Sequence, residues 1–174
     1  MNTEQQKETN RIIVCGVLGI ITMVYLALIG CVNVQHFNYK MNSDIGAEAV
    51  LARLIWNSGE MVPSTWISST ETRIIATPQL AALFYGWTGD MNLGLGLACC
   101  VMTTGILLAI WCFMKKAGFR SESCLLMCVL SLALSGNMTI LELLYLFASY
   151  YGIHVITFFF IMNCYVMLIC WSEG

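Results

Sequence analysis

Hydrophobic residues are grouped into long blocks without charged residues along this chain, and two of the blocks are longer than the others. The first block covers 12–32 and the second covers 91–114. A helix rises 1.5 Å per residue, so the first block gives a helix about 31 Å long, which matches a bilayer hydrocarbon core of about 30 Å. Both blocks are therefore predicted to be transmembrane helices.

Two more apolar blocks follow, at 123–141 and at 153–171. The block at 123–141 is interrupted by Ser135-Gly136-Asn137, which leaves two interpretations. Either it crosses the membrane with a kink, or it ends near Ser135 and the following residues lie on the outer surface as an amphipathic helix. The chain is predicted to be one all-α integral membrane domain, 1–174, with about four transmembrane helices.

The composition agrees with this class and excludes others. Only 10% of the residues are charged and the mean hydropathy is +0.77, whereas a soluble domain has about 25% charged residues. A net charge of −2 without a basic run argues against nucleic acid as a partner and leaves membrane lipid as the surrounding medium. The nine cysteines lie in apolar runs, where a free thiol acts as a small hydrophobic group. No metal site is predicted from them.

The basic residues predict the orientation of the chain. Lys7 and Arg11 precede the first block, and Lys115 and Lys116 end the second. Cytoplasmic flanks carry an excess of Lys and Arg, so the amino terminus is predicted to be cytoplasmic. The interval 33–90, with half of the ten acidic residues, then forms a long extracytoplasmic loop.

This outer loop is predicted to contain helices. Ser43 is suited to cap a helix that begins at Asp44, and Gly59 is a natural end for it. Asp44 and Glu48 would lie one turn apart on one face of that helix. The apolar run 80–87 is too short to span and is expected to be a re-entrant or interfacial helix.

The outer loop also carries a resemblance to a known family. Its pattern has an acidic SD…E…LAR helix, then G-E-x-x-P-S-x-W, then S-T-E-x-R and T-x-Q-L, and Y-Y-G-I-H follows at 150–154. The pattern resembles multi-spanning proteins of Gram-positive anaerobes, which in turn resemble the GT-C glycosyltransferases that use polyprenyl-phosphate-linked sugars. The resemblance implies a multi-pass protein of a bacterial plasma membrane. GT-C enzymes usually have more spans, so this chain is expected to be the amino-terminal part of one, with further helices from the rest of the chain or from a partner.

The resemblance also implies roles for single residues. In GT-C enzymes an acid in the first outer loop deprotonates the acceptor hydroxyl or helps to hold a divalent metal. Asp44 matches that place best and Glu48 is the second choice, as general base. The expected substrate-binding residues are those suited to a phosphate, a sugar ring or a prenyl chain, namely Trp66, Glu71, Arg73 and His154.

Structural explanations remain open for these residues. Asp44 is also favoured in a first helical turn by the helix dipole, and Trp66 and Trp87 fit the aromatic belt of a membrane protein. Two other function classes also remain, a noncatalytic scaffold or partner subunit and a small oligomeric transporter. Only the enzyme is expected to lose its activity on the exchange Asp44→Asn.

Overall fold

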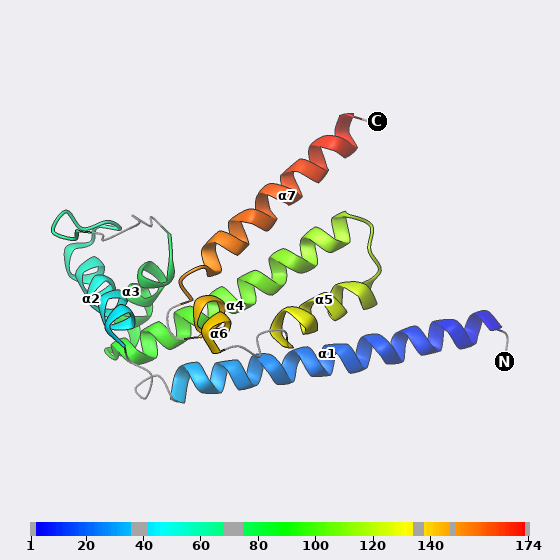
Figure 1. Cartoon of the computed structure of the whole chain (residues 1–174), viewed down its shortest axis with the longest axis horizontal. Helices are drawn as coiled ribbons and strands as arrows, with labels where there is room; N and C mark the ends of the chain where they lie inside the picture. Colours follow the sequence, from blue (N-terminus) through cyan, green and yellow to red (C-terminus); the bar gives the residue numbers. More distant parts are fainter. Residues whose placement is uncertain (1–2, 36–41, 68–74, 134–137, 147–148, 173–174) are drawn as a thin grey trace.

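The chain is all-helical wherever its structure is described. The computed structural model describes residues 3–35, 42–67, 75–133, 138–146 and 149–172, and these ranges contain no strand. The helices, in chain order (Figure 1), are α1 Thr3–Gln35, α2 Ser43–Ser58, α3 Thr77–Thr88, α4 Met91–Lys116, α5 Ser121–Ala133, α6 Met138–Leu144 and α7 Gly152–Ser172.

Three of these helices, α1, α4 and α7, are long and apolar enough to cross a membrane. They contain the predicted spans 12–32, 91–114 and 153–171, so the prediction of apolar helices long enough to span is confirmed for these three. Helix α1 begins before its predicted span, because Lys7 pairs with Glu4 and Arg11 pairs with Glu8 at a spacing of three residues. Such pairs support a helical turn in water.

The predicted third span, 123–141, is described as two helices, α5 and α6. Helix α5 has 13 residues, which corresponds to about 20 Å and is short of a hydrocarbon core of about 30 Å. The polar interruption at 135–137 lies outside the described residues. Among the residues that the structure does describe, the number of helices of spanning length is therefore three.

Helices α1, α4 and α6 meet at a buried polar joint, which consists of Asn33, Thr103 and the Tyr145 carbonyl. Tyr145 directly follows α6, so its main-chain carbonyl lacks the partner that a continuing helix would supply. The Nδ2 group of Asn33, at the end of α1, donates to this carbonyl at 2.9 Å, and the Thr103 hydroxyl of α4 lies 3.4 Å from it. Asn33 and Thr103 are fully buried. A carbonyl at membrane depth must be satisfied within the protein, and these two side chains do so.

Helix α1 approaches α4 most closely beside this joint. A Cβ atom added to Gly96 of α4 would overlap the main-chain oxygen of Asn33. Among the described α1 side chains only Ile29 and Asn33 are buried. The absence of a side chain at Gly96 thus allows the two backbones to touch, as small residues do between membrane helices.

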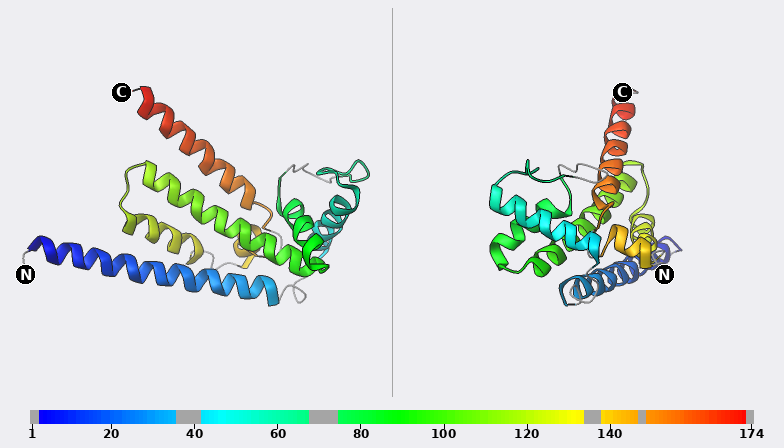
Figure 2. Two further views of the ribbon diagram at one scale, coloured as in Figure 1. Left: turned by 180° about the vertical axis from the view of Figure 1, so that it is seen from behind. Right: turned by 60° about the vertical axis from the view of Figure 1, so that its left-hand side comes forward.

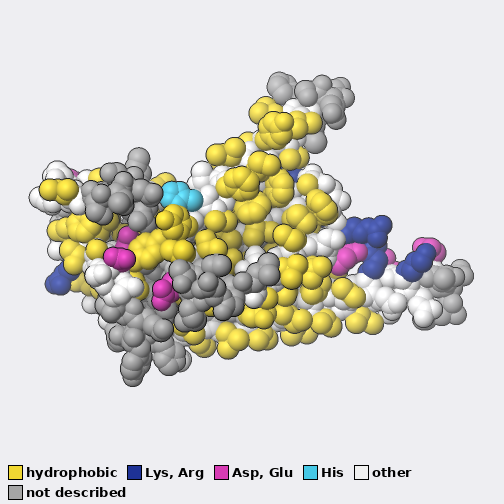
Figure 3. Space-filling model, in the orientation of Figure 1, with side chains coloured by type: hydrophobic (Ala, Val, Ile, Leu, Met, Phe, Trp, Pro, Cys, Tyr) yellow, Lys and Arg dark blue, Asp and Glu magenta, His cyan; other side chains and the backbone are white. Residues whose placement is uncertain are grey.

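The polar groups lie at the two ends of the molecule. Helices α2 and α3 lie together at one end, and the amino terminus and the link between α4 and α5 lie at the other (Figure 2). On the face shown in Figure 3, hydrophobic side chains cover the middle and charged side chains lie toward the ends. This distribution fits a protein embedded in a membrane.

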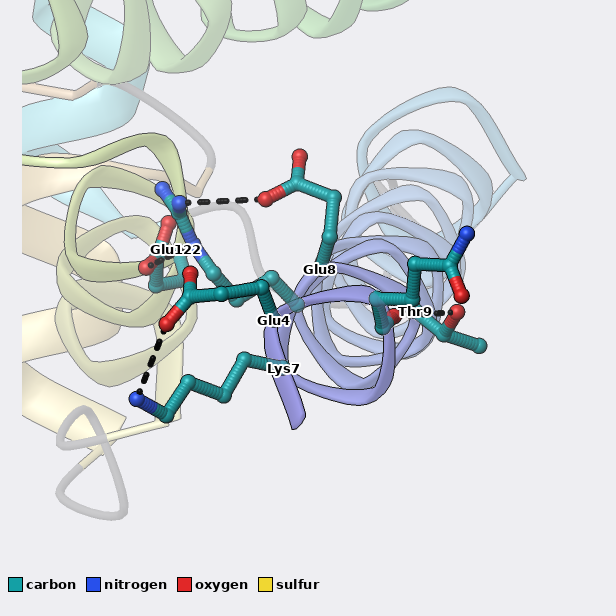
Figure 4. A network of polar contacts seen from close by, with 7 residues as sticks. Glu4, Lys7, Glu8, Thr9 and Glu122 are labelled. Atoms are coloured by element: carbon teal, nitrogen blue, oxygen red, sulfur yellow. Dashed lines mark hydrogen bonds and ion pairs between the residues drawn. The ribbon is translucent and has the colours of Figure 1, made fainter. Parts of the chain in front are cut away.

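An ion pair joins α1 to α5 at the amino-terminal end. The Nε group of Arg11 donates to Oε1 of Glu122 at 3.0 Å. Figure 4 shows Glu122 of this pair and the carboxylate of Glu8, which also pairs with Arg11. It also shows the pair of Lys7 with Glu4. A hydrogen bond from its own main-chain N–H and another from Arg11 lower the pKa of Glu122.

This lowered pKa predicts an acid-dependent loss of stability. A carboxyl group whose pKa is lower in the folded state stabilises the protein above its ordinary pKa, and the effect is lost as the pH falls through the folded value. The melting temperature of the protein should therefore exceed that of Glu122→Gln at neutral pH, by a small amount because water reaches the pair through the exposed Arg11. The difference should vanish on acidification below about pH 4.

Thermal unfolding in detergent at a series of pH values measures this difference. Glu4→Gln is the control, because Glu4 belongs to an exposed pair within one helix. A difference between the protein and Glu122→Gln that stays constant across the series would contradict the prediction.

Candidate functional site

Helix α2 carries both predicted acids, and its start differs from the prediction by one residue. Asn42, with φ −110° and ψ 178°, is the N-cap, and its side chain accepts a hydrogen bond from the Ile45 N–H at 2.8 Å. Ser43 is instead the first helical residue, and its hydroxyl lies 3.5 Å from Oδ1 of Asp44. Asn, Ser and Asp are all good caps, so the backbone geometry decided among three adjacent candidates. The predicted end at Gly59 is confirmed by its left-handed φ of +71°.

The two predicted acids lie one turn apart on α2, as expected, but they differ in exposure. Asp44 is exposed, whereas Glu48 is half-buried. Glu48 precedes Ala52 by four residues and Ile55 by seven, so it shares the buried side of α2 with them. Its carboxylate lies close enough to Cys99 of α4 for an electrostatic interaction. Of these two acids, Asp44 is therefore the more accessible.

Trp66 lies half-buried in the connection that follows α2. The Trp66 N–H donates to the Pro63 carbonyl at 2.9 Å, which closes a turn. Gln79 in the first turn of α3 donates through Nε2 to the Met61 carbonyl at 3.2 Å. Its Oε1 atom accepts from the Ala76 N–H at 2.9 Å. Gln79 thus ties the segment near Met61, which leads to Trp66, to the start of α3.

His154 lies exposed in the first turn of α7, at the predicted end of the fourth span. Its ring lies 5.8 Å from that of Tyr151. The turn that precedes α7 is tied to α3, because the Thr77 hydroxyl lies 3.4 Å from the Ser149 carbonyl. The first turn of α3 therefore holds the segments that carry Trp66 and His154.

Thr77 and Gln79 hold these segments together, although the sequence patterns did not predict this role. Both are buried, with exposed fractions of 1% and 7%. The available signal was Pro78, because proline is favoured in the first turn of a helix. The remaining substrate-binding candidates, Glu71 and Arg73, lie outside the described residues.

The described residues contain no group of three or more His, Cys, Asp or Glu side chains that could hold a metal ion. No family model, curated protein or solved structure matches this sequence.

Proposed function

We propose that the chain is the amino-terminal portion of a GT-C-type membrane glycosyltransferase, which moves a sugar from a polyprenyl-phosphate carrier to an acceptor at the outer face. The observation that carries the proposal is the position of Asp44. It is an exposed carboxylate in the first turn of α2, and this helix is fixed by its buried residues Ile45, Ala52 and Ile55. Such an acid is accessible to a substrate and held on a rigid element.

The proposed roles follow from the chemistry of the transfer. Asp44 takes the proton from the acceptor hydroxyl as general base. The leaving lipid phosphate gains negative charge, which fixed donors stabilise, and Arg73 and His154 are proposed for this task. Glu71 is proposed as a further substrate-binding residue. Trp66 offers an aromatic face to the sugar ring or to the prenyl chain. Glu48, on the inner side of α2, is proposed to support the helix.

The proposed orientation has the amino terminus in the cytoplasm. Lys7 and Arg11 lie near the start of α1, and the ion pair of Arg11 with Glu122 joins this end to the start of α5. Lys115 and Lys116 at the end of α4 and Arg120 just before α5 lie at the same end. A basic end of this kind faces the cytoplasm by the positive-inside rule. The opposite end, with α2 and α3, then faces the outer leaflet, where a lipid-linked sugar would be presented.

A noncatalytic membrane subunit is the second candidate. It is favoured by the apolar side chains that α1 and α7 leave exposed, such as Ile20 and Met23 on α1 and Phe160 and Leu168 on α7. Helices of a partner would cover these surfaces as well as lipid does. Under this alternative the Asp44 carboxylate has no chemical role.

Photolabelling tests the proposed site without knowledge of the sugar. The probe is a short polyprenyl phosphate with a diazirine next to the phosphate, added to membranes that contain the protein. We expect labelled peptides from 42–67 or 149–160. Excess unlabelled polyprenyl phosphate should suppress this labelling, and the corresponding polyprenol should not, because it lacks the phosphate. Labelling that is confined to lipid-facing α1, or that the competitor leaves unchanged, would overturn the proposal.

A further inference from the structure

Helix α3 crosses α4 with the two backbones nearly in contact. A Cβ atom added to Gly94 of α4 would lie 3.0 Å from the Ala81 carbonyl oxygen and 3.2 Å from the Tyr85 nitrogen. Ala81 and Ala82 are fully buried. The side of α3 near Ala81 and Tyr85 therefore faces α4.

The opposite side of α3 is apolar and uncovered. Leu83 is 63% exposed and Trp87 is 86% exposed, and at a spacing of four residues they lie on one face. Leu83 is two positions from both Ala81 and Tyr85, which is about 200° around a helix of 3.6 residues per turn. Leu83 and Trp87 thus point away from α4, and we call them the α3 apolar face.

The crossing lies at the outer boundary of the hydrocarbon core. A core of about 30 Å corresponds to about 20 helical residues. Counted back along α4 from Met114, the last residue before Lys115 and Lys116, this length reaches Leu95. Gly94 and the part of α3 that crosses it are therefore level with the lipid headgroups.

Helix α3 also lies over the side of α4 that faces lipid. Val101 and Leu108 follow Gly94 at intervals of seven residues, so the three lie on one side of α4. Val101 is 45% exposed and Leu108 is 59% exposed. Lipid that contacts these two residues continues outward along α4 to the level of α3.

We propose that the α3 apolar face is a lipid-binding surface in the headgroup layer of the outer leaflet. Tryptophan is enriched at this depth because its ring is apolar and its N–H is polar, and an interfacial helix buries its apolar face at the headgroup boundary. The ring of Trp56 on α2 packs directly against Gly86 of α3. Lipid contact by α3 therefore also sets the depth of α2, independently of any sugar transfer.

Tryptophan fluorescence in lipid vesicles tests the proposal on the whole chain. The emission lost in Trp87→Phe, relative to the unaltered protein, reports on Trp87, and Trp111→Phe is the control for the loss of another indole. We expect lipids brominated near the headgroup to quench this component more than lipids brominated near the chain end, with little quenching by aqueous iodide. Strong quenching by iodide alone would show that Trp87 faces water. Quenching by neither would show that protein covers it. Either of these results overturns the proposal.

Discussion

Replacing Gly96 by leucine is expected to destabilise the protein by about 3 kcal/mol. A Cβ at this position would overlap the main-chain oxygen of Asn33, and a backbone atom cannot turn aside as a side chain can. Helix α1 would have to move away from α4, which would also weaken the hydrogen bond from Asn33 to the Tyr145 carbonyl. Unfolding of the purified protein in mixed detergent micelles with increasing dodecyl sulfate measures the loss.

The matched control is Gly30→Leu on α1. A Cβ at Gly30 meets no atom within 4 Å, so this exchange brings only the gain in helix propensity, about 1 kcal/mol or less. Equal stability of the two variants would show that α1 and α4 are not in backbone contact at Gly96. In that case the missing side chain at Gly96 would not explain the position of α1 against α4.

The exchange Asp44→Asn is expected to lower the rate of sugar transfer by about 100-fold to 10,000-fold. Asparagine has nearly the same shape and is also exposed at this place, but its amide cannot accept the proton of an acceptor hydroxyl. The melting temperature should change little, because the contact described for the carboxylate is a long one of 3.5 Å with Ser43 and its interaction with the helix dipole contributes about 1 kcal/mol or less. Transfer of labelled sugar from a polyprenyl-phosphate donor, in membranes with the full-length protein, is the measurement.

Glu60→Gln serves as the control for this exchange. Glu60 is also an exposed acid at the same end of the molecule, and its Oε2 accepts a hydrogen bond from the Ser64 N–H at 3.1 Å. Glutamine keeps such an acceptor and should transfer sugar at the unaltered rate. If Asp44→Asn also keeps the full rate, Asp44 is not the base and the noncatalytic alternative is favoured.

The spanning helices could be predicted from the sequence because their cause is local. A long uncharged apolar run is suited to cross a hydrocarbon core, and α1, α4 and α7 each contain one. The end of α2 was also local, since Gly59 adopts a left-handed conformation that other residues avoid. The position of Asp44 at the start of a helix followed in the same way from the residues around it.

Other features depended on which helices pack together, and no local pattern contains that information. Glu48 lies one turn from the exposed Asp44, and the packing of α2 on its neighbours decided that Glu48 is the half-buried one of the two. The third apolar block, 123–141, is long enough to span, yet its described residues form the two shorter helices α5 and α6. Side chains from α1 and α4 satisfy the Tyr145 carbonyl that follows α6. Hydrophobic length thus determined that the chain enters a membrane. Contacts between residues far apart in the sequence decided which polar groups face inward and which remain accessible.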